Sequence, residues 1–446
     1  IKSTGYIACG IYAPWKDIIT VNGGDFTVVN GIGIVARAGQ VTVNGGTFTC
    51  DGSAKGRVGD KHFDMDAAQA LYFDASDPAY PAYNSETDYI KVRGGTFSSD
   101  VSVYVDNGYI FNSENNTVET LGETNSVAKI GENYYKTLAE AIAAANSGDT
   151  VTLLKDFQGA ATISKNLTLD LGGHTLSAAG SVLDLYGDVI IKNGTITTAR
   201  AGTGAVWVNQ TAKLTVEEDV TIAATDASSF AIGYWSDCTA AEVIFKGTIT
   251  GGNGITMNGK IPEGTSNKLT VDGAKITVSG HGIYQAGCAE TSFSINDSTI
   301  TGSTGIEVRA GGLTVTNCVI SGNGTFASAS NGNGTTTDGA GIAIVQHTTK
   351  APINVTISGG EISGTKAIYQ ANLENGSAED IAKIKLSVTD GKFTGPIECA
   401  DLTGFITGGH FTDEPSANYV KSGLYVVPSE EAGYTYTVST TAPTEA

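Results

Sequence analysis

The sequence predicts an all-β fold, a right-handed parallel β-helix in which the chain coils repeatedly around one long core. Apolar residues alternate with polar ones in short runs, with the period of two that a strand buried on one face requires. A short corner motif recurs along the chain at steps of about 20 to 27 residues, which is the length of one solenoid coil. Glycine-bearing corners separate the runs, because a sharp corner needs a positive φ. These observations together indicate a repeat protein.

One coil can be followed completely in the stretch 279–301. A glycine corner is followed by three short alternating strands at 283–285, 293–295 and 299–301. His281 is the middle residue of the corner, and its side chain is expected to be exposed there.

Two phrases mark the repeat along the whole chain. The first is a corner, apolar–x–Gly/Asn–Gly–x–apolar–Thr/Ser, with copies at 21–27, 43–49, 92–98, 191–197, 271–277, 295–301, 357–363 and 406–412. The second is a small residue, then an inward apolar residue and an outward residue. Stacked in register, the inward residues form an internal ladder: Ile11, Leu71, Leu183, Val206, Ile232, Ile255, Ile283, Ile306, Ile342 and Ile368. The outward residues form an external ladder: Tyr12, Tyr72, Asp184, Trp207, Gly233, Thr256, Tyr284, Glu307, Ala343 and Tyr369.

In addition to the coil repeat, a longer duplicated segment predicts the domain boundaries. The segment 94–109 (GGTFSSDVSVYVDNGY) matches 408–425 (GGHFTDEPSANYVKSGLY), and each closes a run of coils. Residues 1–122 are therefore expected to be the C-terminal part of a first β-helix module with its cap. Residues 126–440 are expected to form a complete second module, and 441–446 a linker.

One amphipathic helix is expected at 137–146 (TLAEAIAAAN), where Thr137 and Glu140 have the spacing of a capping box. It lies at the start of the second module. Because the first coil of a solenoid exposes strand edges, a helix here is expected to act as an N-terminal cap.

The composition restricts the partners. The chain has 446 residues, 58 of them glycine, and a formal net charge of −20. This charge argues against nucleic acid and anionic membrane surfaces, which would repel the protein. No apolar run approaches the roughly 20 residues that span a bilayer, so no membrane insertion is expected. The chain begins without Met, signal peptide or wall-sorting tail and is interpreted as a piece of a longer, extracellular protein, expected to be monomeric.

The six cysteines do not form a CxxC pair, so a structural zinc site is not indicated. Cys238 and Cys288 occupy similar places in coils that are not adjacent. Two coil spacings of roughly 4.8 Å exceed the reach of a disulfide. Most cysteines are therefore expected to be free, buried and small apolar residues, with a disulfide between loops as the alternative.

The string at 134–156 (YYKTLAEAIAAANSGDTVTLLKD), the coil consensus and the GGTFSSD–YV–GY cap resemble the pectin-lyase-like β-helix modules of large surface proteins from Gram-positive gut bacteria. The resemblance covers nearly the whole chain and implies the fold and a secreted or wall-attached location. It leaves the function open, because this fold carries lyases, hydrolases, epimerases, phage tailspikes and adhesins.

Three residues are candidates for catalysis: Glu307, Arg309 and His281. Glu307 and Arg309 lie on one face of one strand, an arrangement more often found as a surface salt bridge than as an acid–base pair. Gly280-His281-Gly282 matches the GHG of polygalacturonases, but the NTD, aspartate-pair and RIK companions of that motif are absent. The pattern therefore favours a protein without catalysis.

No metal or cofactor is predicted. Calcium-dependent lyases hold the ion with carboxylates on neighbouring coils, whereas Asp184 and Glu307 on the external ladder are several coils apart. The loop 371–380 offers Glu374 and Glu379 as further carboxylates for a glycosidase.

An aromatic surface is the remaining candidate. Five aromatic residues fall on or beside outward positions: Trp207, Tyr234, Trp235, Tyr284 and Tyr369. Aromatic faces along a flat sheet can stack on sugar rings or anchor a protein partner, and local packing under loops is the alternative. Glu307 and Arg309 are expected on the same face. The loop 322–338 and the insertion 61–88, with Tyr72, Phe73, Tyr80 and Tyr83, interrupt the coils as recognition loops often do.

We therefore expect a non-enzymatic cell-surface adhesin or stalk that binds a host glycan or a host protein. The alternative is a polysaccharide lyase or glycoside hydrolase acting on acidic or host glycans through Glu307, Arg309 and His281. A passive spacer is the third possibility.

Overall fold

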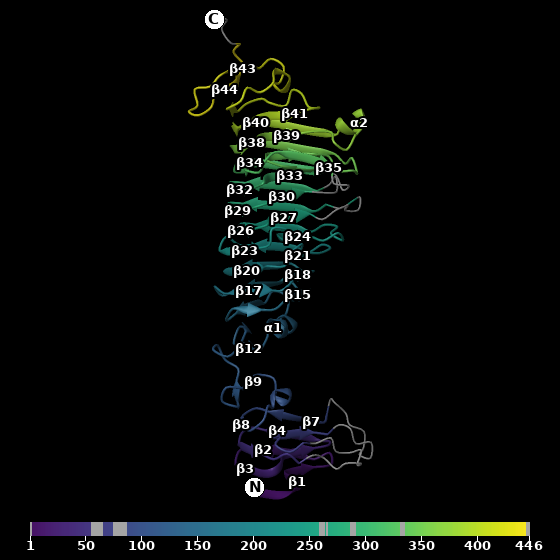
Figure 1. Ribbon diagram of the computed structural model, residues 1–446, viewed down its shortest axis with the longest axis vertical. Coiled ribbons are helices and arrows are strands. Elements are labelled where there is room, and N and C mark those ends of the chain that lie inside the picture. The colour runs from purple at the N-terminus through teal and green to yellow at the C-terminus, as the bar shows by residue number, and fades with distance from the viewer. Residues whose placement is uncertain are drawn as a thin grey trace. The chain divides into compact units, whose positions relative to one another are not determined.

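The computed structural model describes residues 2–54, 66–74, 87–257, 264, 266–285, 291–330 and 335–442. This part of the chain is mostly β-strand in long sheets of parallel strands, which is compatible with the predicted β-helix (Figure 1). The chain divides into two compact units: unit 1 comprises Ile1–Val127 and Glu132–Thr137, and unit 2 comprises Ala128–Gly131 and Leu138–Ala446.

Unit 1 contains two sheets of mainly parallel strands, and the larger one ends in an antiparallel hairpin. The larger sheet contains β1 (Lys2–Ala13), β3 (Asp25–Ala36), β5 (Thr47–Cys50), β6 (Leu71–Phe73), β8 (Gly95–Phe97), β9 (Tyr109–Asn112) and β10 (Thr117–Thr120). The smaller contains β2 (Ile18–Val21), β4 (Gln40–Val43) and β7 (Tyr89–Val92). The single-turn helix η1 spans Ser102–Tyr104. Of the insertion noted above, Tyr80 and Tyr83 lie outside the described residues.

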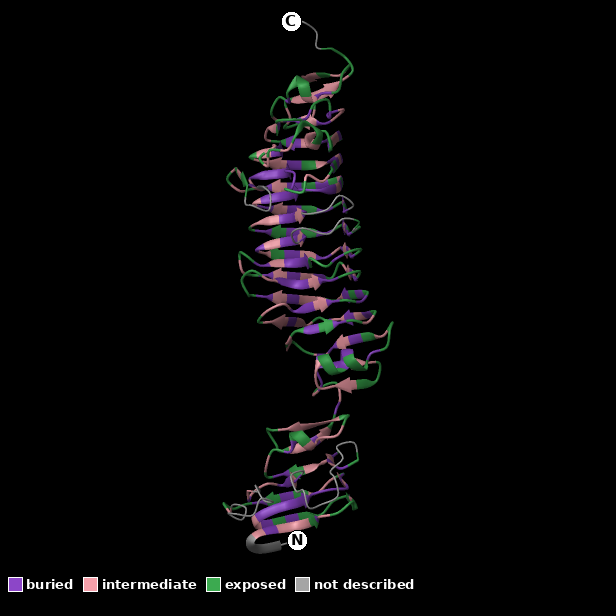
Figure 2. Ribbon diagram, turned by 90° about the vertical axis from the view of Figure 1, so that its right-hand side faces the viewer, coloured by how far each residue is buried: buried purple, intermediate pink, exposed green. Residues whose placement is uncertain are grey.

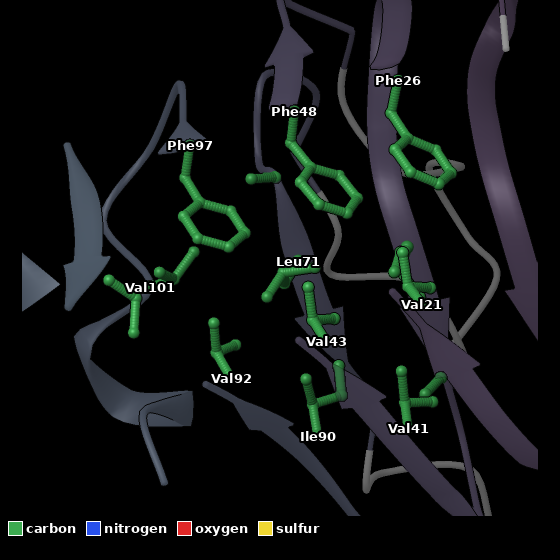
Figure 3. Packing of buried hydrophobic residues seen from close by; sticks show 14 of the residues in the cluster. Val21, Phe26, Val41, Val43, Phe48, Leu71, Ile90, Val92, Phe97 and Val101 are labelled. Carbon is green, nitrogen blue, oxygen red and sulfur yellow. The ribbon is translucent and has the colours of Figure 1, made fainter. Parts of the chain in front are cut away.

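Phenylalanine rings from successive coils stack in the core of unit 1 (Figure 3). The ring centroids of Phe26 and Phe48 are 4.4 Å apart, and those of Phe48 and Phe97 are 5.2 Å apart. Each ring belongs to a copy of the corner phrase. Gly46 and Gly95, with φ of +119° and +120°, turn the chain just before Phe48 and Phe97. The corner phrase thus places one aromatic ring per coil in a single column.

Unit 2 has a shorter parallel sheet that carries the external ladder. Its strands are β15 (Ala161–Ile163), β18 (Leu183–Leu185), β21 (Gly204–Val208), β24 (Phe230–Tyr234), β27 (Asn253–Met257), β30 (His281–Gln285), β33 (Thr304–Val308), β37 (Ala340–Ile344), β39 (Lys366–Gln370) and β41 (Ile397–Cys399). We call it the ladder sheet.

The longer sheet of unit 2 supplies the other strands of each coil. It contains β13 (Thr150–Leu153), β14 (Phe157–Gln158), β16 (Leu167–Asp170), β17 (Thr175–Ala178), β19 (Val189–Lys192), β20 (Gly194–Thr198), β22 (Lys213–Val216), β23 (Val220–Ala224), β25 (Glu242–Phe245), β26 (Thr248–Gly251), β28 (Lys268–Asp272), β29 (Lys275–Val278), β31 (Ser292–Asn296), β32 (Thr299–Gly302), β34 (Gly311–Gly322), β38 (Ile353–Gly364), β40 (Ile384–Thr394), β42 (His410–Phe411), β43 (Tyr425–Pro428) and β44 (Tyr436–Ser439). The short strand β11 (Ala128–Ile130) also belongs to this sheet and pairs antiparallel with β13. The strand β12 (Asn133–Tyr135) follows β11 in the chain.

The unit 2 part of the predicted ladders is confirmed by the strand register. In unit 1, Ile34 pairs with both Ile11 and Leu71, so those two residues are not direct neighbours as predicted. In the ladder sheet, residues pair in the order Leu183, Val206, Ile232, Ile255, Ile283, Ile306, Ile342 and Ile368. All of these side chains are buried. In Figure 2, buried positions alternate with more exposed ones along many strands of unit 2. The period of two therefore sets which side chains enter the core.

The two matching segments fold alike at the end of each unit. In unit 1, β10 pairs antiparallel with β8 and β9, and in unit 2, β44 pairs antiparallel with β42 and β43. A short 3-10 helix precedes each hairpin: η1 in unit 1 and η2 (Ala417–Tyr419) in unit 2. The hydroxyl of Tyr104 accepts the Phe73 N–H, and the hydroxyl of Tyr419 accepts the Cys399 N–H, both at 3.1 Å.

The predicted helix is present as α1 (Leu138–Ala144) and contacts β13 and β15. It buries Leu138, Ala141 and Ile142. The ammonium group of Lys165 donates hydrogen bonds to the Ala143 and Ala145 carbonyls at 2.7 Å each, at the C-terminus of the helix.

The cysteines at 9, 50, 238, 318 and 399 are free, as predicted, and Cys288 lies outside the described residues. Four of these five are buried. Burial raises the pKa of Cys238 to about 12, so this thiol stays protonated at neutral pH.

Candidate functional site

The outer face of the ladder sheet carries the residues that were predicted from the sequence to form the external ladder. The external ladder is confirmed in register, in the order Asp184, Trp207, Gly233, Thr256, Tyr284, Glu307, Ala343 and Tyr369. Four strands thus separate Asp184 from Glu307, as the sequence predicted.

Glu307 lies at the centre of a polar cluster on this face, yet its side chain has no exposed surface. Its Oε2 atom accepts a hydrogen bond from the Thr337 N–H at 2.8 Å and lies 3.1 Å from His281 Nε2. His281 occupies the strand before Glu307 in the ladder sheet, where it pairs with Thr304. The Glu307 side chain therefore points away from the core of the sheet but has no contact with solvent.

The seal is a β-hairpin from the long loop after β34. Strands β35 (Ala327–Ser330) and β36 (Thr335–Asp338) pair antiparallel, and β36 contacts β33. The Thr304 hydroxyl donates to the Thr337 carbonyl, and the Ser303 hydroxyl donates to Asp338 Oδ1 at 2.7 Å. The expected recognition loop is thus, in its described part, a cover fixed by hydrogen bonds to the strand below it.

Arg309 completes the cluster two residues beyond Glu307. Its Nε lies 3.9 Å from Glu307 Oε1, and its guanidinium carbon lies 5.1 Å from the centre of the Tyr284 ring. Only 1% of the side chain is exposed. Burial lowers the pKa of Arg309 to about 10, although the charge of Glu374 acts against this shift. The guanidinium group still carries its charge at neutral pH.

The proton on His281 can be placed from its contacts. Nε2 lies 3.1 Å from Glu307 Oε2 and 3.2 Å from the Thr337 carbonyl oxygen, and both are acceptors, so Nε2 carries a hydrogen. Burial acts to lower the pKa of His281, but the hydrogen bond to Glu307 and its negative charge outweigh it, so the pKa is raised. Burial also raises the pKa of Glu307, only partly offset by His281 and Thr337.

Two expectations about this cluster were wrong. His281 is not an exposed corner residue: it begins strand β30, and 13% of its side chain is exposed. Glu307 and Arg309 do not form a surface salt bridge, because both side chains are buried, Glu307 beneath the hairpin. Period-two reasoning placed both residues outward correctly but contained no information on what folds over that face.

Unit 1 contains a related arrangement that the sequence reasoning missed. Arg37 Nε lies 3.4 Å from Asp74 Oδ2, both side chains are nearly buried, and the Arg37 guanidinium carbon lies 5.7 Å from the Tyr12 ring centre. The similarity is visible in the sequence, because Gly33–Gly39 reads GIVARAG and Gly305–Gly311 reads GIEVRAG. In both units an arginine that directly follows a parallel strand lies over a tyrosine ring of the preceding coil.

A second feature of the ladder sheet is an aromatic cluster formed by Trp207, Phe230 and Trp235. The Trp207 ring centroid is 5.0 Å from that of Phe230 and 4.7 Å from that of Trp235, with planes nearly perpendicular in both pairs. A Cβ atom on Gly233 would lie 2.6 Å from both Trp207 Cζ3 and Phe230 Cε2. Glycine at position 233 therefore allows the indole to lie against strand β24. Trp235 remains 44% exposed.

The other predicted ligand-binding aromatics are less accessible. Tyr234 was expected on or beside the outer face, but it is fully buried and its hydroxyl donates to the Lys268 carbonyl at 2.5 Å. The reason is parity, since Tyr234 lies two residues after the inward Ile232. Tyr369 faces outward but is buried because the Phe326 ring packs against it at 4.9 Å. Tyr284 is half-buried between His281 and Arg309.

The further carboxylates do not join these groups into a metal centre. Glu379 is exposed on the short helix α2 (Ala378–Ile381), and the Glu374 charge acts on Arg309. Among the described residues, no three His, Cys, Asp or Glu side chains lie together as metal ligands would. Within the same ranges, no helix has the length and apolar character needed to cross a membrane.

Comparisons with family models, curated proteins and solved structures found no significant match to this chain.

Proposed function

We propose that the chain is a non-enzymatic binding part of a bacterial surface protein, secreted or attached to the cell wall. In this proposal two right-handed parallel β-helix modules act as a rigid support, α1 caps the second module, and the protein acts as an adhesin. Its partner is a host glycan or a host protein, bound through exposed parts of the β-helix face.

The burial of Glu307, Arg309 and His281 is the observation that carries this proposal. A lyase or hydrolase must bring its acid and base within hydrogen-bond distance of the glycosidic substrate. Here the exposed fractions of the Glu307, Arg309 and His281 side chains are 0%, 1% and 13%. The Glu307 carboxylate is instead bonded to Thr337 of the covering hairpin. These groups stabilise the coil and its cover.

The charge of the chain supports the same reading. With a formal net charge of −20, the protein repels polyuronides and sulfated glycans, the substrates that an acidic-polysaccharide lyase would need to collect. The exposed aromatic surface at Trp235 is better suited to an uncharged partner.

The test compares the wild type with Glu307→Gln on polyuronides and on neutral and host glycans. Unsaturated product is followed by ultraviolet absorbance, new reducing ends by a colorimetric assay, and binding by retention on immobilised glycans or host proteins. We expect no product from either protein and equal retention of both. Wild-type turnover that disappears in Glu307→Gln would overturn the proposal in favour of an enzyme, and absence of any retention would favour a passive spacer.

A further inference from the structure

We propose that the ladder-sheet surface around Trp207, Trp235 and Tyr186 binds a neutral oligosaccharide. This inference rests on the proposed binding function and names its ligand class and its site. Three features support this site: the rigid aromatic cluster, a second exposed ring two coils earlier in the chain and the negative charge around both.

The aromatic cluster is held in place before any ligand arrives. Trp207 contacts both Phe230 and Trp235 edge to face, and the absence of a side chain at Gly233 lets the rings sit directly on the strand. Ordering a flexible side chain on binding costs free energy, so rings that are already fixed bind more tightly. With 44% of its side chain exposed, Trp235 offers apolar ring surface to a ligand.

A second aromatic ring lies along the same column. Leu185, Val208 and Tyr234 pair in register across β18, β21 and β24. Tyr186 and Trp235 follow directly after the first and the last of them, so the two lie two strands apart, about 10 Å at the usual strand spacing. Tyr186 is 43% exposed. A chain of sugar rings running across the strands can contact both residues, whereas a single sugar can contact only one.

Two carboxylates lie near these rings. Asp184 is the register neighbour of Trp207 on the outer face. Asp237, two residues after Trp235, accepts the Gln210 N–H at 3.2 Å. Carboxylates accept hydrogen bonds from sugar hydroxyls but repel uronate, sialate and sulfate groups. The site therefore favours neutral sugars over acidic ones.

A cationic ligand fits the geometry less well, although carboxylates and aromatic rings also attract ammonium groups. An aromatic cage leaves space between its rings for the cation. Here the rings are in contact with one another, at centroid distances of 4.7 and 5.0 Å. The cluster therefore presents an outer surface and encloses no ligand.

Tryptophan fluorescence provides the test, because the chain has three tryptophans and two belong to the cluster. The full chain is titrated with neutral hexasaccharides of glucose, mannose, galactose and xylose, with the matching monosaccharides, with oligogalacturonate and with choline. Variants are Trp235→Ala, Tyr186→Ala and, as a matched control, Trp15→Ala in unit 1, where Trp15 is also exposed. Circular dichroism and the unfolding temperature verify that each variant folds.

We expect at least one neutral hexasaccharide to change the fluorescence and to bind more tightly than its monosaccharide. Trp235→Ala should weaken this binding about tenfold or more, Tyr186→Ala should weaken it less, and Trp15→Ala should leave it unchanged. The inference would be overturned if no neutral sugar changed the fluorescence, or if oligogalacturonate or choline bound more tightly than the neutral sugars. Glycan binding that persists in a folded Trp235→Ala protein would overturn this site but leave the proposed binding function intact.

Discussion

Glu307 illustrates how a residue on the outer face of a parallel sheet becomes buried. It receives a backbone N–H from Thr337 and the Nε2–H of His281, and Arg309 lies beside it. A buried ion pair contributes little net stability, but removing one partner leaves the other buried and uncompensated, which is strongly destabilising. The cluster is therefore expected to act as a structural unit.

Removing the Glu307 carboxylate should destabilise unit 2 strongly. Glu307→Ala leaves the buried Thr337 N–H and His281 Nε2 without their acceptor and removes the negative charge beside Arg309, at a cost of about 3 kcal/mol. Glu307→Gln keeps one acceptor oxygen and should cost less. Urea unfolding measures both. Glu217→Ala is the matched control, because Glu217 pairs with Lys246 at 3.1 Å near the surface and should matter little. Equal stability of Glu307→Ala and wild type would show that the hairpin does not seal this group.

The His281–Glu307 pair should make stability depend on pH. The folded-state pKa of His281 is raised above 6.5, so its contribution is fully present below pH 6.5 and is lost as the pH rises through the folded value. The raised pKa of Glu307 acts in the same direction. Unfolding temperatures between pH 5.5 and 9 should fall more steeply for wild type than for His281→Gln.

His174 provides the comparison for this pH dependence, because its side chain is 36% exposed and it lies more than 100 residues before His281 in the chain, near Asp156. His174→Gln should follow the wild-type curve. Parallel curves for wild type and His281→Gln would contradict the assigned pairing.

At the scale of elements, the strands were predictable and their covers were not. The internal ladder from Leu183 to Ile368 follows from alternation within each coil, which is a local property of the sequence. The same rule, applied to Ile232 and Tyr234, would have placed Tyr234 inside. Burial of Glu307 depends on a hairpin 30 residues away, and no period in the sequence reports where such a hairpin docks. The solvent exposure of the candidate site residues could therefore be determined only from the structure.

The helix α1 offers a test at this scale. Lys165 donates to the Ala143 and Ala145 carbonyls, which α1 itself leaves without partners at its C-terminus. Lys165→Met should lower the free energy of unfolding by about 1 kcal/mol, because these capping bonds and a favourable charge at the helix end are lost. The same change at the exposed Lys155 should have no effect. Chemical denaturation followed by far-ultraviolet circular dichroism compares the two, and identical midpoints would contradict the capping role.

At the scale of the whole molecule, the chain consists of two units, each with its own core and a similar ending. Unit 1 has the Phe26–Phe48–Phe97 stack, and unit 2 has the Phe393–Phe411 stack, with ring centroids 5.1 Å apart. Independent cores favour independent unfolding.

Calorimetry should therefore resolve two transitions. Phe48→Ala opens a cavity in unit 1 and should destabilise that unit by about 3–5 kcal/mol, without moving the other transition. Phe393→Ala should have the complementary effect in unit 2. A single transition displaced by both substitutions would contradict independent units.

The central claim is that the candidate catalytic residues Glu307, Arg309 and His281 are buried and that the hairpin covers Glu307. Amide hydrogen exchange at Thr337 tests this most directly, because its N–H donates to the buried Glu307 carboxylate. We expect slow exchange in the native protein and fast exchange in Glu307→Ala. Exchange of the Thr337 amide in the wild type at the rate of an open loop would contradict the account and leave Glu307, Arg309 and His281 accessible to a substrate.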